Sequence, residues 1–346
     1  MSKTETLTMA APEKPKGKAR VTTLRTELVR IAGIALVIGA AIALFRSDPF
    51  VLNMMAYTFL FGALASSWNI IGGFGGQFSL GHGVFFAIGG YTTANLYFHW
   101  QISPWLSLVP AMILAMTVAV LVSWPTFRLK GPFFAIATLA LNEVAFVLAN
   151  YFDVLTGGAR GMMLPFKAGL ENMVFTSRLP YALIMFGFLI VCLIVCAFVL
   201  RSRLGYYLQA VHIDEDAARA VGIDVLKVKL TGMAVSAALT GIGGSLFAMY
   251  LRFVDPATLL SIQDIGVKFL LISLIGGVGT LYGPLAGALL IIPLEFYLRG
   301  SLSGVVPGAN LLVLGALLVI FSLFMRRGVV GAAQTLWVKF RRDDHE

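Results

Sequence analysis

Polar side chains that could contact a solute stand inside apolar stretches long enough to cross a membrane. They are Gln77, Ser79, His82, Asn142 and Glu143. Polar groups at that depth are expected to face a bundle interior or a wet cavity, and a carboxylate at the centre of a span costs about 2.5–3.5 kcal/mol on insertion scales. We therefore predict that these residues line a solute pathway. His82 could instead hold a structural hydrogen bond, and Glu143 could pair with a basic group of a partner or stay protonated.

Glycines cluster in two segments of similar sequence. The segment "GGFGGQFSLGHG" holds Gly72, Gly73, Gly75, Gly76, Gly81 and Gly83, and the segment "GGVG" holds Gly276, Gly277 and Gly279. Glycine allows helices to approach closely or the backbone to break, and a broken helix exposes amide and carbonyl groups that can bind charged ends of a solute. Tight packing alone would also explain these glycines. The match of "IIGGFG" (70–75) to "LIGGVG" (274–279) would fit two parallel repeats of one hinge.

A charged segment interrupts the apolar sequence in "IDEDAARAVGIDV". Acidic residues favour a helix start, Ala and Arg are strong helix formers, and Gly is the usual helix stop. The segment therefore predicts one short helix, which we expect to lie across a membrane face. Its residues are Asp214, Glu215, Asp216, Ala217, Ala218, Arg219 and Gly222.

Catalytic and metal-binding motifs do not occur in the sequence. It contains no H-E-x-x-H, no G-x-S-x-G and no G-x-x-x-x-G-K-[ST] phosphate-binding loop. Cys192 and Cys196, the only cysteines, lie four residues apart in an apolar run, where cysteine behaves as a small hydrophobe. We therefore expect no enzymatic activity, no metal site and no disulfide.

The composition indicates an all-α membrane protein. Hydrophobic residues make up 58% of the 346 residues and charged residues only 12%, against about 25% charged in soluble domains. Apolar runs without period-2 alternation predict helices rather than strands. The net charge of +9 does not indicate nucleic-acid binding, because the basic residues lie at the ends of apolar segments and in the tails.

About ten spans are predicted, with eight or nine as the alternative. Their ranges are 28–45, 50–71, 78–98, 104–125, 131–151, 180–200, 230–251, 266–281, 283–298 and 308–325. An N-in, C-in arrangement places most of the 26 Lys and Arg residues in the cytoplasm, as the positive-inside rule requires. The predicted organisation is a disordered basic cytoplasmic tail (1–27), a transmembrane domain (28–325) and a cytoplasmic C-terminal tail (326–346). The charged loop 201–229 is then cytoplasmic and the loop 152–179 is external.

Four stretches of the sequence together resemble one family. The pattern D-A-A-x-x-x-G at residues 216–222 resembles the coupling loop of ABC-importer permeases, with Asp216 in place of the usual Glu. The stretches "NIIGGFGGQFSLGHGVFFAIGGYT" (69–92), "GPFFAIATLALNEVAFVLAN" (131–150) and "LISLIGGVGTLYGPLAGALLI" (271–291) resemble the branched-chain amino acid importer permeases, LivM-type. The resemblance covers residues from about 50 to 325.

The resemblance implies a function and a set of partners. Such a permease sits in the bacterial inner membrane and pairs with a second, related permease, two ATPase subunits and an external solute-binding protein. It translocates branched-chain or other apolar amino acids, while ATP and Mg²⁺ are bound by the ATPases and no cofactor by the permease. The segment 214–222 would transmit ATPase closure.

Other functions remain as alternatives. A urea or amide importer permease would share the glycine segments. An autonomous secondary transporter or channel is a different class, but such proteins usually bury several ionisable residues, and here mainly Glu143 lies deep in a span.

Overall fold

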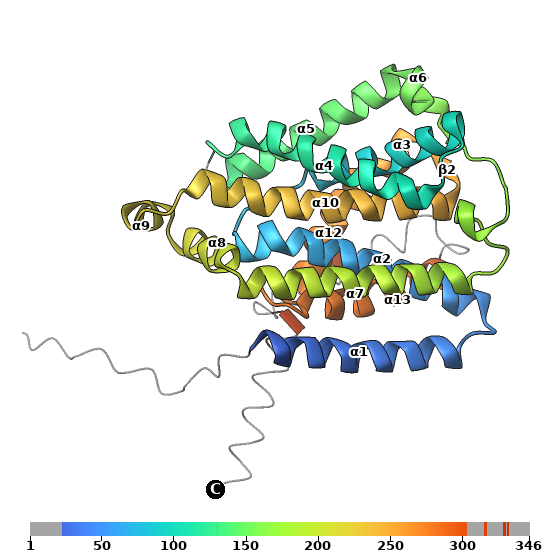
Figure 1. The fold of residues 1–346 in the computed structure, drawn as a ribbon, viewed down its shortest axis with the longest axis horizontal. Helices are drawn as coiled ribbons and strands as arrows, with labels where there is room; N and C mark the ends of the chain where they lie inside the picture. Colours follow the sequence, from blue (N-terminus) through green and yellow to red (C-terminus); the bar gives the residue numbers. More distant parts are fainter. Residues whose placement is uncertain (1–22, 130, 303–314, 317–327, 330, 332–346) are drawn as a thin grey trace, which may run out of the picture.

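The computed structural model describes residues 23–129, 131–302, 315–316, 328–329 and 331. In this part of the chain, long helices run side by side in one bundle (Figure 1). The long helices are α1 Leu24–Leu44, α2 Pro49–Asn69, α3 His82–Trp100, α4 Pro104–Thr126, α5 Pro132–Tyr151, α7 Leu179–Arg201, α10 Val225–Leu251 and α13 Gly283–Leu302.

Shorter elements connect the long helices. The α-helical ones are α6 Asp153–Thr156, α8 Arg203–Ile213, α9 Glu215–Ala220, α11 Pro256–Leu259 and α12 Lys268–Gly276. Two segments are π-helical, η1 Ile70–Phe74 and η4 Ile262–Val267, and two are 3₁₀, η2 Gly158–Arg160 and η3 Leu170–Asn172. The strands β1 Met162–Met163 and β2 Phe253–Val254 pair antiparallel.

The helical class and the multi-pass membrane character are confirmed. Within the described residues, seven helical segments are long and apolar enough to span a membrane: Leu24–Leu44, Pro49–Phe74, Pro104–Thr126, Pro132–Tyr151, Leu179–Arg201, Val225–Leu251 and Pro256–Gly276. Helices α3 and α13 also cross the bundle but are not among the seven. The predicted span 308–325 and nearly all of the two predicted tails lie outside the described residues, so the count of ten and the N-in, C-in orientation stay predictions.

Several predicted boundaries differ from those observed: α3 begins at His82 rather than at residue 78, and α10 begins at Val225 rather than at residue 230. The first helix begins at Leu24 rather than at residue 28. The span placed at 266–281 begins earlier, at Pro256, and ends at Gly276. The early start is not evident in the sequence because Asp255, Asp264 and Lys268 interrupt the apolar run, whereas α11, η4 and α12 follow one another with only residues 260–261 outside helical structure.

Proline and aspartate define several helix starts. Pro49 occupies the first turn of α2, where its missing N–H costs nothing, and Asp48 accepts hydrogen bonds from the backbone N–H of Phe50 (2.9 Å) and Val51 (3.2 Å). Asp224 caps α10 in the same way through the N–H of Lys227, 3.1 Å away. Such caps satisfy backbone donors that the helix leaves unpaired.

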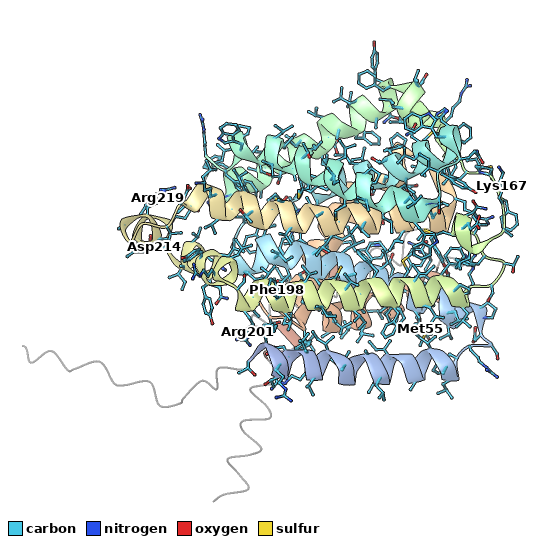
Figure 2. All side chains as sticks on the ribbon, viewed as in Figure 1. Met55, Lys167, Phe198, Arg201, Asp214 and Arg219 are labelled. Carbon is cyan, nitrogen blue, oxygen red and sulfur yellow. The ribbon has the colours of Figure 1, made fainter. Side chains whose placement is uncertain are left out.

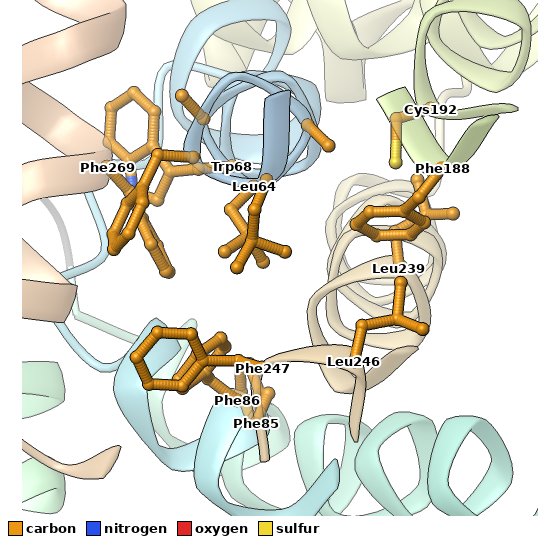
Figure 3. Close-up of a cluster of buried hydrophobic side chains, with 14 of the residues drawn as sticks. Leu64, Trp68, Phe85, Phe86, Phe188, Cys192, Leu239, Leu246, Phe247 and Phe269 are labelled. Atoms are coloured by element: carbon orange, nitrogen blue, oxygen red, sulfur yellow. The ribbon is translucent and has the colours of Figure 1, made fainter. Parts of the chain in front are cut away.

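Helix α10 lies at the centre of the bundle. It packs against α3, α4 and α2, and buried hydrophobic side chains that include several aromatic rings gather between α2, α3, α7, α10 and α12 (Figure 3). In that cluster the Phe86 ring centroid lies 5.3 Å from that of Phe247 and 6.1 Å from that of Phe269. Aromatic pairs of this kind contribute about 0.5–1.5 kcal/mol each beyond their burial.

The two polar loops lie at opposite ends of the bundle. Figure 2 shows Asp214 and Arg219, at α9, at one end and Lys167, in the loop that carries β1, at the other. This arrangement agrees with the prediction that loops 201–229 and 152–179 face opposite sides of the membrane. We call the end that carries α9 the α9 end and the opposite one the loop end.

The close contact of α3 with α10 leads to a first prediction. A methyl group at Gly244 would lie 1.9 Å from the backbone oxygen of Phe86, while one at Gly187, on α7, would meet nothing within 4 Å. Gly244→Ala should destabilise the protein by about 1–3 kcal/mol through overpacking. Gly187→Ala is the matched control and should be neutral or stabilising, because Ala is favoured over Gly in helices by about 1 kcal/mol. Thermal unfolding of the detergent-solubilised protein measures both, and equal melting temperatures would contradict the packing argument.

Candidate functional site

The glycine-rich segment contains a break in the helix. Helix α2 passes into η1, which contains Gly72 and Gly73, and the chain then leaves helical structure until α3 begins at His82. Gly76 adopts a positive φ of 67°, and a methyl group there would lie 2.5 Å from the imidazole ring of His212 on α8. Gly75 precedes it, Gly81 precedes α3, and Gly83 lies in its first turn. We call the segment 75–81 the first connection.

The second glycine segment is also a break, and it contacts the first. Helix α12 ends at Gly276, and Gly277 and Gly279 adopt positive φ values of 126° and 77°. The Asn69 side chain joins the two breaks: its Nδ2 donates to the Thr280 carbonyl (2.9 Å), and its Oδ1 accepts from the Gly279 N–H (2.9 Å). The two similar sequences therefore meet in space, although nothing in the sequence alone pointed to Asn69.

His82 joins the first connection to two helices. Its Nδ1 lies 3.1 Å from Ser79 Oγ and its Nε2 lies 2.9 Å from Ser236 Oγ on α10. Because the Ser236 hydroxyl donates to the Ser67 carbonyl (2.6 Å), Ser236 must accept from Nε2–H, so His82 Nε2 carries a proton. Both ring nitrogens are thus occupied, and the fully buried ring offers a solute no hydrogen bond in this conformation.

Asn142 and Glu143 point in different directions from α5. Asn142 is fully buried, and its Nδ2 donates to the Leu260 carbonyl at 2.8 Å. Its Oδ1 is buried without a hydrogen-bond partner among the described residues and faces Gly83, where a methyl group would lie 2.5 Å away. Glu143 is exposed on the outside of the bundle. A solute or basic group that contacts Glu143 must therefore lie outside the described part of this bundle.

The predicted short helix is present as α9. Asp214 caps it by accepting from the N–H groups of Asp216 (2.9 Å) and Ala217 (3.0 Å). It ends at Ala220; Gly222, two residues later, has a φ of +87°, and the N–H of Ile223 closes the turn on the Ala218 carbonyl at 3.0 Å. Arg219 lies on the exposed face and pairs with Asp216 at 2.8 Å.

Glu215 ties α9 to α10. The Lys229 ammonium, whose side chain is 1% exposed, pairs with Glu215 Oε1 and lies 5.8 Å from the centre of the Phe127 ring. Removing one partner of such a pair costs about 3–5 kcal/mol, because the other charge is left buried. Lys229 was not predicted from the sequence, where the only signal for it was a basic residue in the second turn of a membrane-spanning helix.

Gln77 also belongs to this contact. Its Nε2 lies 3.5 Å from the same Glu215 Oε1, and Gln77 N donates to the Ile71 carbonyl at 3.0 Å. A residue predicted for the solute pathway and a residue predicted for coupling are therefore neighbours at the α9 end. The first connection, α9 and α10 meet at one carboxylate.

Comparison with known proteins gives the family. Residues 50–322 match the family described as "Branched-chain amino acid transport system / permease component". The high-affinity branched-chain amino acid transport system permease protein LivM of Escherichia coli is 28% identical over 320 residues, which cover 86% of this chain and 74% of that protein. LivM of Salmonella typhimurium is 28% identical over 301 residues, covering 80% and 69%.

A second group of relatives is more distant. The LivH permease protein of the same transport system in Salmonella typhimurium is 23% identical over 287 residues, covering 78% of this chain and 91% of that protein. No solved structure matches the chain significantly. Since the matched segment spans most of the sequence, the resemblance seen in the motifs is confirmed, and the protein is a transport subunit rather than an enzyme: the chain belongs to the family of permease components of branched-chain amino acid transport systems.

Proposed function

We propose that the chain is the permease subunit of an ABC importer that moves branched-chain amino acids across the bacterial inner membrane. Its partners are a second, related permease, two ATPase subunits and an external solute-binding protein. ATP and Mg²⁺ bind to the ATPases, this chain binds no cofactor, and nucleic acid is not a partner. The observation that carries the proposal is the family match over residues 50–322, together with a short helix that protrudes at the α9 end.

The surface of α9 supports its role as the ATPase contact. Ile213 and Val221 flank the helix with 86% and 77% of their surface exposed, beside the exposed charges of Asp216 and Arg219. Large apolar side chains this exposed at a polar surface are typical of a protein–protein contact. Helix α9 would insert into a groove of an ATPase subunit and move with it.

The contacts of Glu215 supply a route for that movement. A displacement of α9 acts on α10 through the Glu215–Lys229 pair and on the first connection through Gln77. Helix α8 adds a third contact, because its His212 ring packs on Gly76. The helices would then rearrange between outward-facing and inward-facing states while the binding protein supplies the affinity for the solute.

The transport activity itself can be tested in cells. A bacterial strain that lacks uptake of branched-chain amino acids, supplied with this chain and its partner subunits, should take up radiolabelled leucine. Omitting the chain, or using an ATPase variant that cannot hydrolyse ATP, should abolish uptake. Radiolabelled urea is the comparison solute: uptake of urea without leucine would contradict the proposed substrate, and uptake without the ATPases would contradict an ABC importer.

The coupling route gives a second prediction. The double variant Glu215→Leu/Lys229→Met removes both charges, so the fold should persist, while leucine uptake should fall by about tenfold as the link between α9 and α10 is lost. The stimulation of ATPase activity by the loaded binding protein should fall with it. Both are measured with the complete complex in lipid vesicles.

Lys227→Met is the matched control for this prediction. Lys227 lies two residues from Lys229 but is 84% exposed, and its ion pair within the described residues is with its near neighbour Asp224, an interaction worth about 0–1 kcal/mol. Its removal should leave uptake unchanged. A double variant that folds and couples as well as the wild type would rule out the Glu215–Lys229 pair as the route.

A further inference from the structure

A cavity of about 350 Å³ opens between α2, α10, α12 and α13, toward the loop end of the bundle. Its volume lies near the lower end of the range of about 300–1,000 Å³ typical of small-molecule sites. Nothing in the sequence motifs or in the contacts of α9 involves it. Its lining combines four charged side chains with four aromatic rings, an unusual mixture for a membrane-embedded bundle.

The charges alternate in sign along the cavity wall. Asp264 Oδ1 lies 3.8 Å from Lys268 Nζ, Lys268 Nζ lies 3.2 Å from Glu295 Oε1, and that oxygen lies 3.1 Å from Arg299 Nη2. The Glu295–Arg299 contact follows from the i,i+4 spacing of the two residues on one helix. The Lys268–Glu295 contact joins α12 to α13 and was not predicted.

The central pair is shielded from solvent and the outer pair is not. The side chains of Lys268 and Glu295 are 14% and 13% exposed, whereas those of Asp264 and Arg299 are 62% and 63% exposed. The outer charges can therefore meet a solute first, and the inner charges can receive it in a less aqueous setting where ionic hydrogen bonds are stronger.

Aromatic rings form the apolar part of the wall. Lys268 Nζ lies 5.0 Å from the centre of the Phe61 ring, and Tyr57 and Phe296 have ring centroids 5.4 Å apart. Phe247 completes this side of the cavity. A solute held by the charges would place its side chain against these rings.

The backbone beside the charges is irregular. Asp264 belongs to the π-helical segment η4, and Lys268 begins α12 directly after it. Single π-turns within helices occur frequently at functional sites, because they redirect side chains that a regular helix would place elsewhere. Here η4 is the segment that sets Asp264 and Lys268 at the same cavity.

We propose that this cavity is an outer binding site for a zwitterionic amino acid with an apolar side chain. Lys268 and Arg299 would hold the α-carboxylate, Asp264 and Glu295 the α-ammonium, and the aromatic rings the side chain. The inference rests on the proposed function and adds to it the residues that receive the solute from the external binding protein.

The charge pattern also fits weak binding, which a transport route needs. When a zwitterion separates Lys268 from Glu295, one internal ion pair is replaced by two pairs with the solute. No buried charge is left unpaired, and no large net gain arises, because each desolvated charge exchanges one partner for another. A solute without charged groups, such as urea, cannot replace the ion pair in this way.

The first test separates a binding role from a structural one. The double variant Lys268→Met/Glu295→Leu removes both central charges, so folding should survive, and the melting temperature of the purified complex checks this. Leucine uptake by the complete complex in vesicles should fall by about tenfold or more, since a charge-assisted contact of this kind contributes at least about 1.5 kcal/mol. Lys167→Met, which removes an exposed basic residue at the same end, should keep wild-type uptake.

The second test detects occupancy directly. Both native cysteines are buried, so a cysteine introduced at Ala257, which is exposed in the cavity wall, is the accessible thiol. In the reconstituted complex, leucine at twice its Kd should slow the modification of Ala257→Cys by a cationic methanethiosulfonate about threefold. Urea, 4-methylpentanoate (no ammonium) and 3-methylbutylamine (no carboxylate) should not. The control Val154→Cys, exposed on α6 outside this cavity, should react at the same rate with and without leucine.

The outcomes are distinguishable. If wild-type complex fails to take up leucine, the proposed function is wrong, whatever the cavity does. If wild-type uptake is normal and the folded double variant transports equally well, the cavity is not on the solute route. Normal wild-type uptake without protection of Ala257→Cys by leucine would overturn the inference as well, whereas loss of uptake together with selective protection supports it.

Discussion

The structure depends on one constraint: inside a membrane, every polar atom released by a break in a helix must find a partner within the protein. The first connection meets it through side chains of the surrounding helices. Trp68 Nε1 donates to the Ser79 carbonyl at 2.7 Å, and the His82 ring forms hydrogen bonds with Ser79 and Ser236. The Asn69 side chain forms hydrogen bonds with the Gly279 N–H and the Thr280 carbonyl in the second break. These hydrogen bonds hold the breaks in place. The absence of a side chain at Gly73 allows the Gly279 backbone to lie close to it.

The same constraint explains where the charges lie. Buried Lys229 is paired with Glu215 and joins α10 to α9 at the α9 end. Lys268 is paired with Glu295 and joins α12 to α13 toward the loop end. A buried pair contributes little net stability but makes the relative position of its elements specific, because separating them leaves charges unpaired. In the proposed mechanism, the Glu215–Lys229 pair would transmit the movement of a partner subunit at the α9 end, and the Lys268–Glu295 pair would exchange contacts with the solute at the loop end.

Local patterns in the sequence predicted the helices, but they did not predict the contacts between residues far apart in the chain. Apolar run length indicated α2, and the acidic start and Gly222 indicated α9, because these signals act within a few residues. Glu295–Arg299 followed from i,i+4 spacing. The roles of Asn69, Lys229 and Lys268 could not be predicted, since Asn69 and Thr280 are 211 residues apart in the chain and only the fold brings such residues together. Glu143, the most prominent charge in the sequence, faces outward.

Two helices connect the ends of the molecule. Helix α10 carries Lys229 at the α9 end and Phe247 and Leu251 in the wall of the outer cavity; α2 carries Tyr57 and Phe61 in that wall and reaches the first connection through Trp68. Because a hydrogen-bonded helix of 27 residues moves largely as one body, a displacement at Lys229 must alter the cavity wall unless α10 bends. Helix α10 has no internal proline, but Gly243, Gly244 and Ser245 lie between Lys229 and Phe247, and Gly/Ser pairs are also sites at which helices kink. In the proposed mechanism, α10 therefore couples the two ends to the extent that it stays straight at these three residues.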